Sequence, residues 1–477
     1  MKLNLDQLKK TFLSLHGLIV YEDILQDEII RDFYRLLDAV TAKHFDPMEI
    51  WQAYFQFFRD MLGRSWPDHL VQCLLNSQNV FAEQASRHGP ADIDPVVRQS
   101  VLWDLAIVQK LAAIKPSDLK VIIAERSAKA LMDETGIGEK AGNGATPIYK
   151  DDENWPTNWP EWETTSGTAK EIYKSPEGLD SPLNAQQWLL AFKNQVVREF
   201  LAAKSWAHNY NLLADFYRQA GCGILANYAA FRIKNDALVL EGIENPDPIR
   251  LNNLYCQERE QEIVLKNTES FLQNYPANNI ILYGSRGTGK SSLVKALLNE
   301  YVDQGLRLIQ LKKNQIKFFP ELARELAGSP LKFIFFIDDL SFNEEEDDYR
   351  NIKSLLEGGI EARPQNILIY ATSNRRHFVK ESFSERRSDD VHAADTMDEK
   401  LSLADRFGIT VTFLSPDQES YLKIVEGLAR DSGIEIDGQL LRQKALHWAM
   451  LHNGRSGRTA RQFIDNLRAE LALDKTN

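Results

Sequence analysis

The segment GSRGTGKSS, residues 284–292, most narrowly limits the folds open to this chain. It follows the apolar run IILY and leads into SSLVKALLNEYV, which has the composition of a helix. The pattern G-x-x-x-x-G-K-S surrounds phosphate oxygens with backbone N–H groups when it joins a buried strand to a helix. The segment therefore predicts a nucleotide site in an α/β fold.

Two side chains of this loop have defined expected roles. Lys290 reaches the β and γ phosphates, and the Ser291 hydroxyl is a ligand for Mg²⁺. ATP and Mg²⁺ are therefore the expected ligands. The nucleotide contacts expected from the loop involve Gly284, Ser285, Arg286, Gly287, Thr288, Gly289, Lys290, Ser291 and Ser292.

After residue 270, short apolar runs alternate with segments of helical composition. This alternation is typical of a parallel sheet that helices cover on both faces. After residue 416 the pattern is helical again. The predicted strands are NIILYG, LRLIQL, KFIFFID, ILIYAT and ITVTF.

Polar side chains follow two of these strands. Asp338 and Asp339 end the third run, and Asn374 follows the fourth. Asp338 is placed to hold the Mg²⁺ shell at the carboxyl edge of the sheet, and Asp339 to orient the attacking water or accept its proton. Asn374 is expected beside the phosphates, where its amide holds water or the γ phosphate; the alternative is an ordinary turn residue.

The rest of the chain divides by composition and periodicity. At 477 residues it is longer than a single hydrophobic core normally supports, so two or three domains are expected. Apolar residues of helical spacing, such as Ile29, Phe33, Leu36 and Val40, predict a helical start. The predicted parts are a helical N-terminal domain (1–135), an acidic flexible linker (136–181), helices with a small hairpin (182–243), a nucleotide-binding core (244–415) and a helical lid (416–477).

Three tryptophans interrupt the acidic linker. Trp155, Trp159 and Trp162 fall within eight residues of a segment rich in Gly, Pro, Asn and acidic side chains. Solvated linkers rarely carry such large apolar groups, so the indoles dock either on this protein's own surface or on a partner.

Composition excludes several classes of protein. The net charge of -12 argues against a protein that coats polyanions, because such proteins depend on excess Lys and Arg. No run approaches the roughly 18 apolar residues that cross a bilayer, so a cytoplasmic protein without a membrane partner is expected. Cys73, Cys222 and Cys256 show neither CxxC nor metal-ligand spacing and are predicted to be small buried side chains.

These motifs together resemble the AAA+ ATPases, and more narrowly a bacterial AAA+ family known as domain of unknown function 815. The resemblance covers residues 222–470. It implies a P-loop AAA+ core with a five-stranded parallel sheet and a C-terminal helical lid, after a mainly α-helical N-terminal domain. The segments that carry it are RLNNLYCQE, PANNIILYGSRGTGKSSLVKALLNEY, FFIDDLSF, LLEGGIEARPQNILIYATSNRRH, EKLSLADRFG and GRSGRTARQF.

The resemblance also implies roles for single residues. Asp338 and Asp339 correspond to the Walker B pair, and Asn374 to sensor 1. Arg406 corresponds to the arginine finger that a neighbouring subunit inserts, and Arg458 to sensor 2 on a lid helix. A guanidinium suits both tasks, because its fixed charge spreads hydrogen bonds over phosphate oxygens. The segment expected to wrap the adenine comprises Leu254, Tyr255 and Cys256.

One residue departs from the family pattern. Many AAA+ proteins have Glu where this chain has Asp339, which is shorter by one methylene, so slow hydrolysis is one expectation.

If Arg406 acts in trans, the active form is a homo-oligomer with heterologous contacts. The expected activity is ATP hydrolysis that remodels or loads a protein or protein–nucleic acid complex; the alternatives are a slow ATP-gated switch or a scaffold that presents the helical N-terminal domain.

Two further segments bear on the partner. Lys317, Phe318 and Phe319 fall where many AAA+ motors carry a pore loop, but their position before Pro320 favours the anchoring of a helix. Residues 380–400 form a highly charged insertion with arginines nearby, which could contact nucleic acid. Glu and Asp interrupt these arginines, so a solvated face is favoured over that contact.

Overall fold

The computed structural model describes residues 3–135, 155–162, 183–234, 238–340, 364–374, 406–452 and 454–474. The chain forms two compact units. One consists of Met1–Ser181 with Leu190–Asn227, and the other of Pro182–Leu189 with Tyr228–Asn477. The predicted insertion at 380–400, its flanking arginines and most of the acidic linker lie outside the described residues.

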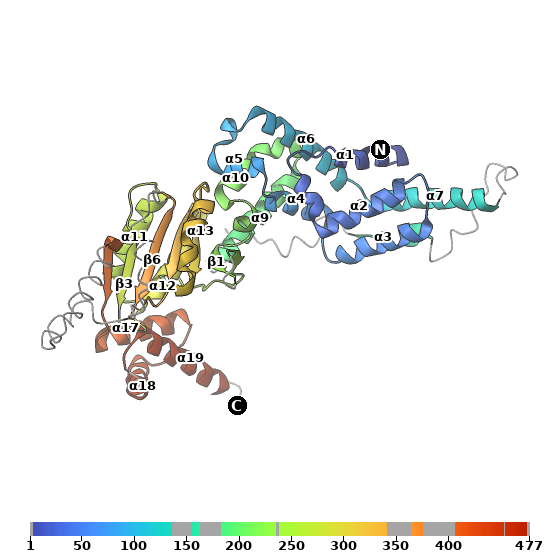
Figure 1. Cartoon of the computed structure of the whole chain (residues 1–477). Helices are drawn as coiled ribbons and strands as arrows, with labels where there is room; N and C mark the ends of the chain where they lie inside the picture. Colours follow the sequence, from blue (N-terminus) through green and yellow to red (C-terminus); the bar gives the residue numbers. More distant parts are fainter. Residues whose placement is uncertain are drawn as a thin grey trace. The chain divides into compact units, whose positions relative to one another are not determined.

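Helices build the first unit (Figure 1). Aspartates begin several of them: the Asp27 carboxylate accepts from the first backbone N–H groups of α2, and Asp46 and Asp94 do so for α3 and α6. The predicted apolar face of α2 is buried, with Phe33, Leu36 and Val40 fully so. The helices are α1 (Leu5–Leu15), α2 (Glu28–Thr41), α3 (Pro47–Asp60), α4 (Trp66–Asn76), α5 (Val80–Arg87), α6 (Pro95–Ala112), α7 (Pro116–Thr135), most of α9 (Ala185–Ala202) and α10 (Tyr210–Ala220).

The tryptophan segment packs within this unit. Trp159 and Trp162 are 6% and 3% exposed, and their rings lie 4.7 and 5.4 Å from the ring of Tyr54. The Lys120 ammonium donates to the backbone carbonyl of Trp159 at 2.8 Å. Of the two interpretations left open by the sequence, docking on the protein's own surface is therefore confirmed for these two indoles; Trp155 is only partly buried.

A seven-stranded sheet organises the second unit. Its order is β2-β1-β4-β5-β6-β3-β7, and all neighbours are parallel except β1 and β2. All five predicted strands are present. The strands are β1 (Ala230–Ile233), β2 (Leu240–Gly242), β3 (Ile280–Gly284), β4 (Leu306–Leu311), β5 (Lys332–Ile337), β6 (Ile367–Ser373) and β7 (Ile409–Phe413).

The expected five-stranded sheet was too small by two strands. The hairpin predicted from the alternation at 226–243 forms as β1 and β2, but β1 also pairs with β4, so that the hairpin extends the sheet. Such short strands carry no local signal for their neighbour, because pairing between strands far apart in sequence depends on tertiary packing.

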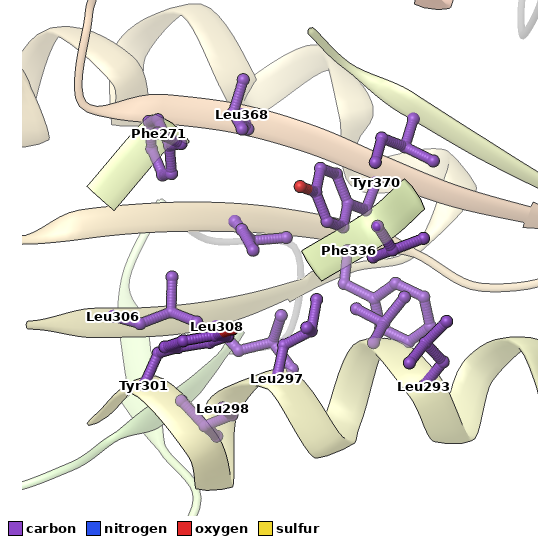
Figure 2. Close-up of a cluster of buried hydrophobic side chains, with 14 of the residues drawn as sticks. Phe271, Leu293, Leu297, Leu298, Tyr301, Leu306, Leu308, Phe336, Leu368 and Tyr370 are labelled. Carbon is purple, nitrogen blue, oxygen red and sulfur yellow. The ribbon is translucent and has the colours of Figure 1, made fainter. Parts of the chain in front are cut away.

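Helices cover both faces of the sheet. Leu293, Leu297 and Tyr301 of α12 (Lys290–Tyr301) pack against alternate residues of β4, β5 and β6, and Phe271 of α11 (Glu258–Leu272) joins them (Figure 2). On the other face, Phe319 of α13 (Phe319–Leu326) meets the ring of Phe335 at 4.9 Å. Burial on both faces explains why these strands are continuously apolar.

The packing of Phe319 bears on the proposed pore loop. Phe319 is 6% exposed, and residues Lys313–Phe318 form a short 3-10 helix that leads into α13. An anchoring role for this part of the Lys317-Phe318-Phe319 segment is therefore confirmed.

Three helices after β7 form a separate apolar cluster. They are α17 (Gln418–Asp431), α18 (Gly438–Leu451) and α19 (Gly457–Asp474), and their shared core includes Tyr421, Val425, Ala445 and Ile464. Figure 1 shows this group below the ends of the strands. Within the described residues, no helix has both the length and the apolar character that crossing a bilayer requires.

Candidate nucleotide site

The glycine-rich loop lies between β3 and α12. Gly289 precedes α12 with a left-handed backbone (φ +92°), and a Cβ there would lie 2.3 Å from Nε2 of Gln257. Gly287 is also left-handed (φ +77°), and its Cβ would lie 2.9 Å from Oγ of Ser456 in the segment before α19. Only glycine fits such positions without strain. The loop is thus closely packed against both the core and the lid.

Lys290 points into the loop. It is 4% exposed, and its Nζ donates to the carbonyls of Gly284 and Ser285 at 2.8 Å each and to Oδ1 of Asn374 at 3.0 Å. Burial lowers the pKa of Lys290 to about 8. The ammonium is therefore held by neutral oxygens at the place where a phosphate would satisfy its charge better.

Asp338 is the centre of an oxygen cluster at the carboxyl edge of the sheet. Its Oδ1 accepts from the hydroxyls of Ser291 and Thr372 at 2.6 Å each. These residues come from the end of β5, the start of α12 and β6, which the parallel order brings together. Hydroxyl and carboxylate oxygens are the ligands that Mg²⁺ prefers, so Ser291 and Asp338 suit that ion.

Asp339 has an unusual backbone conformation. Its φ is +55°, which few residues other than glycine adopt. The backbone N–H of Asp339 donates to Oγ1 of Thr372 at 2.9 Å, and its Oδ1 accepts from Nδ2 of Asn374 at 2.6 Å. These two bonds hold the carboxylate towards Asn374 and help to maintain the left-handed backbone of Asp339.

Thr372 is a positioning residue that the sequence did not single out, although it stands in the Thr-Ser-Asn run that ends β6. Replacing it by valine keeps its shape but removes the bonds to Asp338 and Asp339. We expect the Mg²⁺ concentration for half-maximal ATP turnover to rise about 10–100-fold, the usual effect of losing a partner of a metal ligand.

Thr410→Val, on the exposed side of β7, is the matched control and should leave that Mg²⁺ concentration unchanged. An unchanged Mg²⁺ requirement in Thr372→Val would show that the hydroxyl does not position the carboxylates.

The lid contributes side chains from α17 and α19. Arg458, in the first turn of α19, lies near enough to lower the pKa of Lys290, and its Cβ is 3.2 Å from the place of a Cβ on Gly287. Arg461 and Gln462 of the same helix also line the cavity, which the sequence did not predict. The sequence feature that could have indicated them is their position one helical turn after Arg458.

The predicted adenine segment joins the lid to the core. The Tyr255 hydroxyl donates to Oδ1 of Asp431 at 2.8 Å, and Asn253 Nδ2 donates to the other carboxylate oxygen at 2.9 Å. The Tyr255 ring lies so close to Gly427 that a Cβ there would be 2.3 Å from its Cζ. Leu254 and Tyr255 line the cavity, whereas the Cys256 thiol faces the Ser420 carbonyl at 3.7 Å.

These groups surround one cavity of about 1000 Å³. It brings together most of the predicted site residues and does not include Arg406, which stands beside the buried Phe407 ahead of β7. The residues that line it include Leu254, Tyr255, Arg286, Gly287, Thr288, Gly289, Lys290, Ser291, Ser292, Asp338, Asp339, Thr372, Asn374, Asp431, Arg458 and Arg461.

One known protein family matches the second unit of the chain. Residues 226–471 match the model of the family described as protein of unknown function (DUF815), which is more than half of the chain. The chain belongs to this family. The DUF815 match covers the hairpin, the sheet, the cavity and the lid of the second unit, which has an α/β fold with a glycine-rich loop between a parallel strand and a helix.

The chain also has similarity to solved structures, at low sequence identity. The RuvB Holliday junction branch migration motor of Thermotoga maritima is 17% identical, with 48% of this chain and 67% of that chain covered and a TM-score of 0.32. A single-residue variant of that protein is 16% identical, with 48% of this chain and 68% of that chain covered and a TM-score of 0.34. No curated protein matches this chain.

Proposed function

We propose that this DUF815 protein is a cytoplasmic ATPase that binds and hydrolyses ATP with Mg²⁺, as a homo-oligomer, and uses the cycle to remodel or load a protein or protein–nucleic acid complex. The observation that carries the proposal is the bonded set of Lys290, Asn374 and Asp339 beside the Asp338–Ser291 pair. Each of these groups matches a separate requirement of phosphoryl transfer.

The loop and Lys290 bind the phosphates. Backbone N–H groups at the start of α12 favour negative charge, and the Lys290 ammonium exchanges its carbonyl partners for phosphate oxygens. Mg²⁺, held by Ser291 and Asp338, neutralises charge on the β and γ phosphates when it is bound.

Asp339 and Asn374 act on the attacking water. The Asn374 amide fixes Oδ1 of Asp339, and the carboxylate orients the water and accepts its proton as the water oxygen bonds to the γ phosphorus. The bond from that phosphorus to the β–γ bridging oxygen breaks in the same step, and ADP leaves. Because Asp is shorter than Glu, this base acts from a greater distance, which supports a slow rate of turnover.

The two arginines act on the nucleotide sites of different subunits. Arg458 lies in the cavity on its own lid and stabilises the phosphates in cis. Arg406 stands away from that cavity, which suits action on the site of a neighbour. The site is then complete only in the oligomer.

Mixing two inactive variants tests the shared site. Lys290→Ala lacks a working cavity but supplies Arg406, whereas Arg406→Ala keeps the cavity. Each alone should turn over ATP at least about 10²-fold more slowly than wild type. A random equal mixture creates complete sites at about a quarter of the interfaces, because site and arginine come from adjacent subunits. We expect turnover per subunit to recover towards that fraction.

Arg324→Ala, an exposed arginine of α13, is the matched control and should retain the wild-type rate. Either no recovery in the mixture of two inactive variants or an Arg406→Ala rate equal to wild type would overturn the trans arrangement. Tight ATP binding by wild type without turnover would favour the ATP-gated switch, and a rate that rises only with added nucleic acid would identify the client class.

A further inference from the structure

A second cluster of ligand-type side chains lies in the first unit, far from the nucleotide cavity in sequence. Among the described residues, Asp27, His69 and Cys73 form a group whose ligand atoms all lie within 4.8 Å of one another. His69 and Cys73 are one turn apart on α4, so they share a face, and Asp27 stands at the beginning of α2. All three side chains are partly buried.

The distance between the thiol and the imidazole of this group suits a tetrahedral ion. Sγ of Cys73 lies 3.6 Å from Nε2 of His69, and a zinc ion with its usual bonds to sulfur and nitrogen holds them about 3.6 Å apart. Oδ1 of Asp27 lies 2.8 Å from the same nitrogen. The carboxylate must move outward by about half an ångström to leave room for the ion.

The arrangement does not suit nucleophilic catalysis. In a Cys-His-Asp triad the thiol and the carboxylate contact different nitrogens of the imidazole. Here both approach Nε2 of His69, so all three groups converge on one point. Convergence of a thiol, an imidazole nitrogen and a carboxylate is the pattern of a metal site.

The surrounding charges balance such an ion. A Cys73 thiolate and the Asp27 carboxylate neutralise a divalent cation. Asp23 and Lys193 both act electrostatically on Cys73, one with each sign. Nζ of Lys193 is held by the side-chain oxygens of Asn76 and Asn227, so it has partners of its own.

We propose that Asp27, His69 and Cys73 bind a zinc ion, with water as the fourth ligand. The ion ties the beginning of α2 to α4, and binding releases the Cys73 thiol proton to solvent. Nitrogen and sulfur ligands favour zinc over Mg²⁺ or Ca²⁺, which prefer oxygen. The proposal is independent of the nucleotide site.

Cobalt(II) titration of the metal-free full chain tests the site, with excess Mg²⁺ present to occupy the nucleotide cavity. We expect one equivalent of Co²⁺ to give a thiolate-to-cobalt charge-transfer band in the near ultraviolet and the visible bands of tetrahedral cobalt. Zinc should displace it. Cys73→Ser should abolish the charge-transfer band, and Cys222→Ser, another partly buried thiol of this unit, should retain it.

Two further variants separate metal binding from folding. Asp27→Asn keeps a good helix cap, because asparagine accepts the same backbone N–H groups, and His69→Gln keeps a hydrogen-bonding side chain. Both should fold with unchanged circular dichroism and bind Co²⁺ at least about tenfold more weakly. Absence of the band in wild type, or its survival in Cys73→Ser, would overturn the proposal.

Discussion

Replacing Lys290 by alanine is expected to lower ATP turnover by about 10²–10³-fold, the usual cost of removing a group that faces the charge of the transition state. The lysine is 4% exposed and its Nζ lies among the oxygens of Gly284, Ser285 and Asn374. No other described lysine lines the cavity, so no second ammonium stands ready to replace it. Steady-state phosphate release with saturating Mg²⁺ measures the change.

The same substitution should leave the nucleotide-free protein folded. Burial lowers the pKa of Lys290, which means that the charged form is disfavoured there before a phosphate binds. Thermal unfolding without nucleotide should therefore be nearly unchanged, and only the stabilisation by ATP should disappear. Lys266→Ala, an exposed lysine of α11, is the matched control. Wild-type turnover in Lys290→Ala would contradict the proposed site.

Replacing Trp162 by alanine is expected to lower the free energy of unfolding of the first unit by about 3–5 kcal/mol, as deletion of a buried aromatic side chain does. The indole is 3% exposed, and its ring centroid lies 4.9 Å from that of Phe57 and 6.1 Å from that of Phe33. Its removal leaves a cavity between the docked segment and the α2–α3 pair. Hydrogen exchange of α3 amides, followed by mass spectrometry, measures the loss of protection.

Trp162→Phe provides the sharper comparison. Among the described residues, Nε1 of Trp162 has no hydrogen-bond partner, so phenylalanine removes an unsatisfied donor along with part of the ring. We expect it to cost less than half as much as alanine. Trp155→Ala, in the same segment but only partly buried, should change exchange in α3 little. Equal protection in wild type and Trp162→Ala would show that the docking adds no stability.

The candidate nucleotide site was largely predictable because its parts are local motifs. The loop, the Asp338-Asp339 pair and Asn374 each follow a strand, and parallel strands end at the same edge of a sheet. Thr372 was not singled out, because its importance arises from two bonds to residues on a neighbouring strand. Tyr255 was placed by family resemblance, and its bond to Asp431 joins residues 176 positions apart.

The remaining surprises also involve contacts between distant segments. The absence of metal-ligand spacing around Cys73 predicted a small buried side chain and no metal site. The spacing could not indicate the cluster, because Asp27 comes from another helix. The sequence pattern could not decide whether Trp159 and Trp162 dock on this protein's own surface or on a partner. Either arrangement buries the same apolar area of the indoles. The packed structure shows their partners on α3.

By itself the sequence determined the fold class, the phosphate loop and the strands that carry its acidic partners. Those features depend on backbone geometry and periodicity within a few neighbouring residues, where composition is decisive. Only the tertiary structure decided the extra pair of strands, the Thr372 bridge, the lid contact at Asp431 and the Asp27–His69–Cys73 cluster. Each depends on which apolar surfaces pack together, and that choice is made by the whole chain.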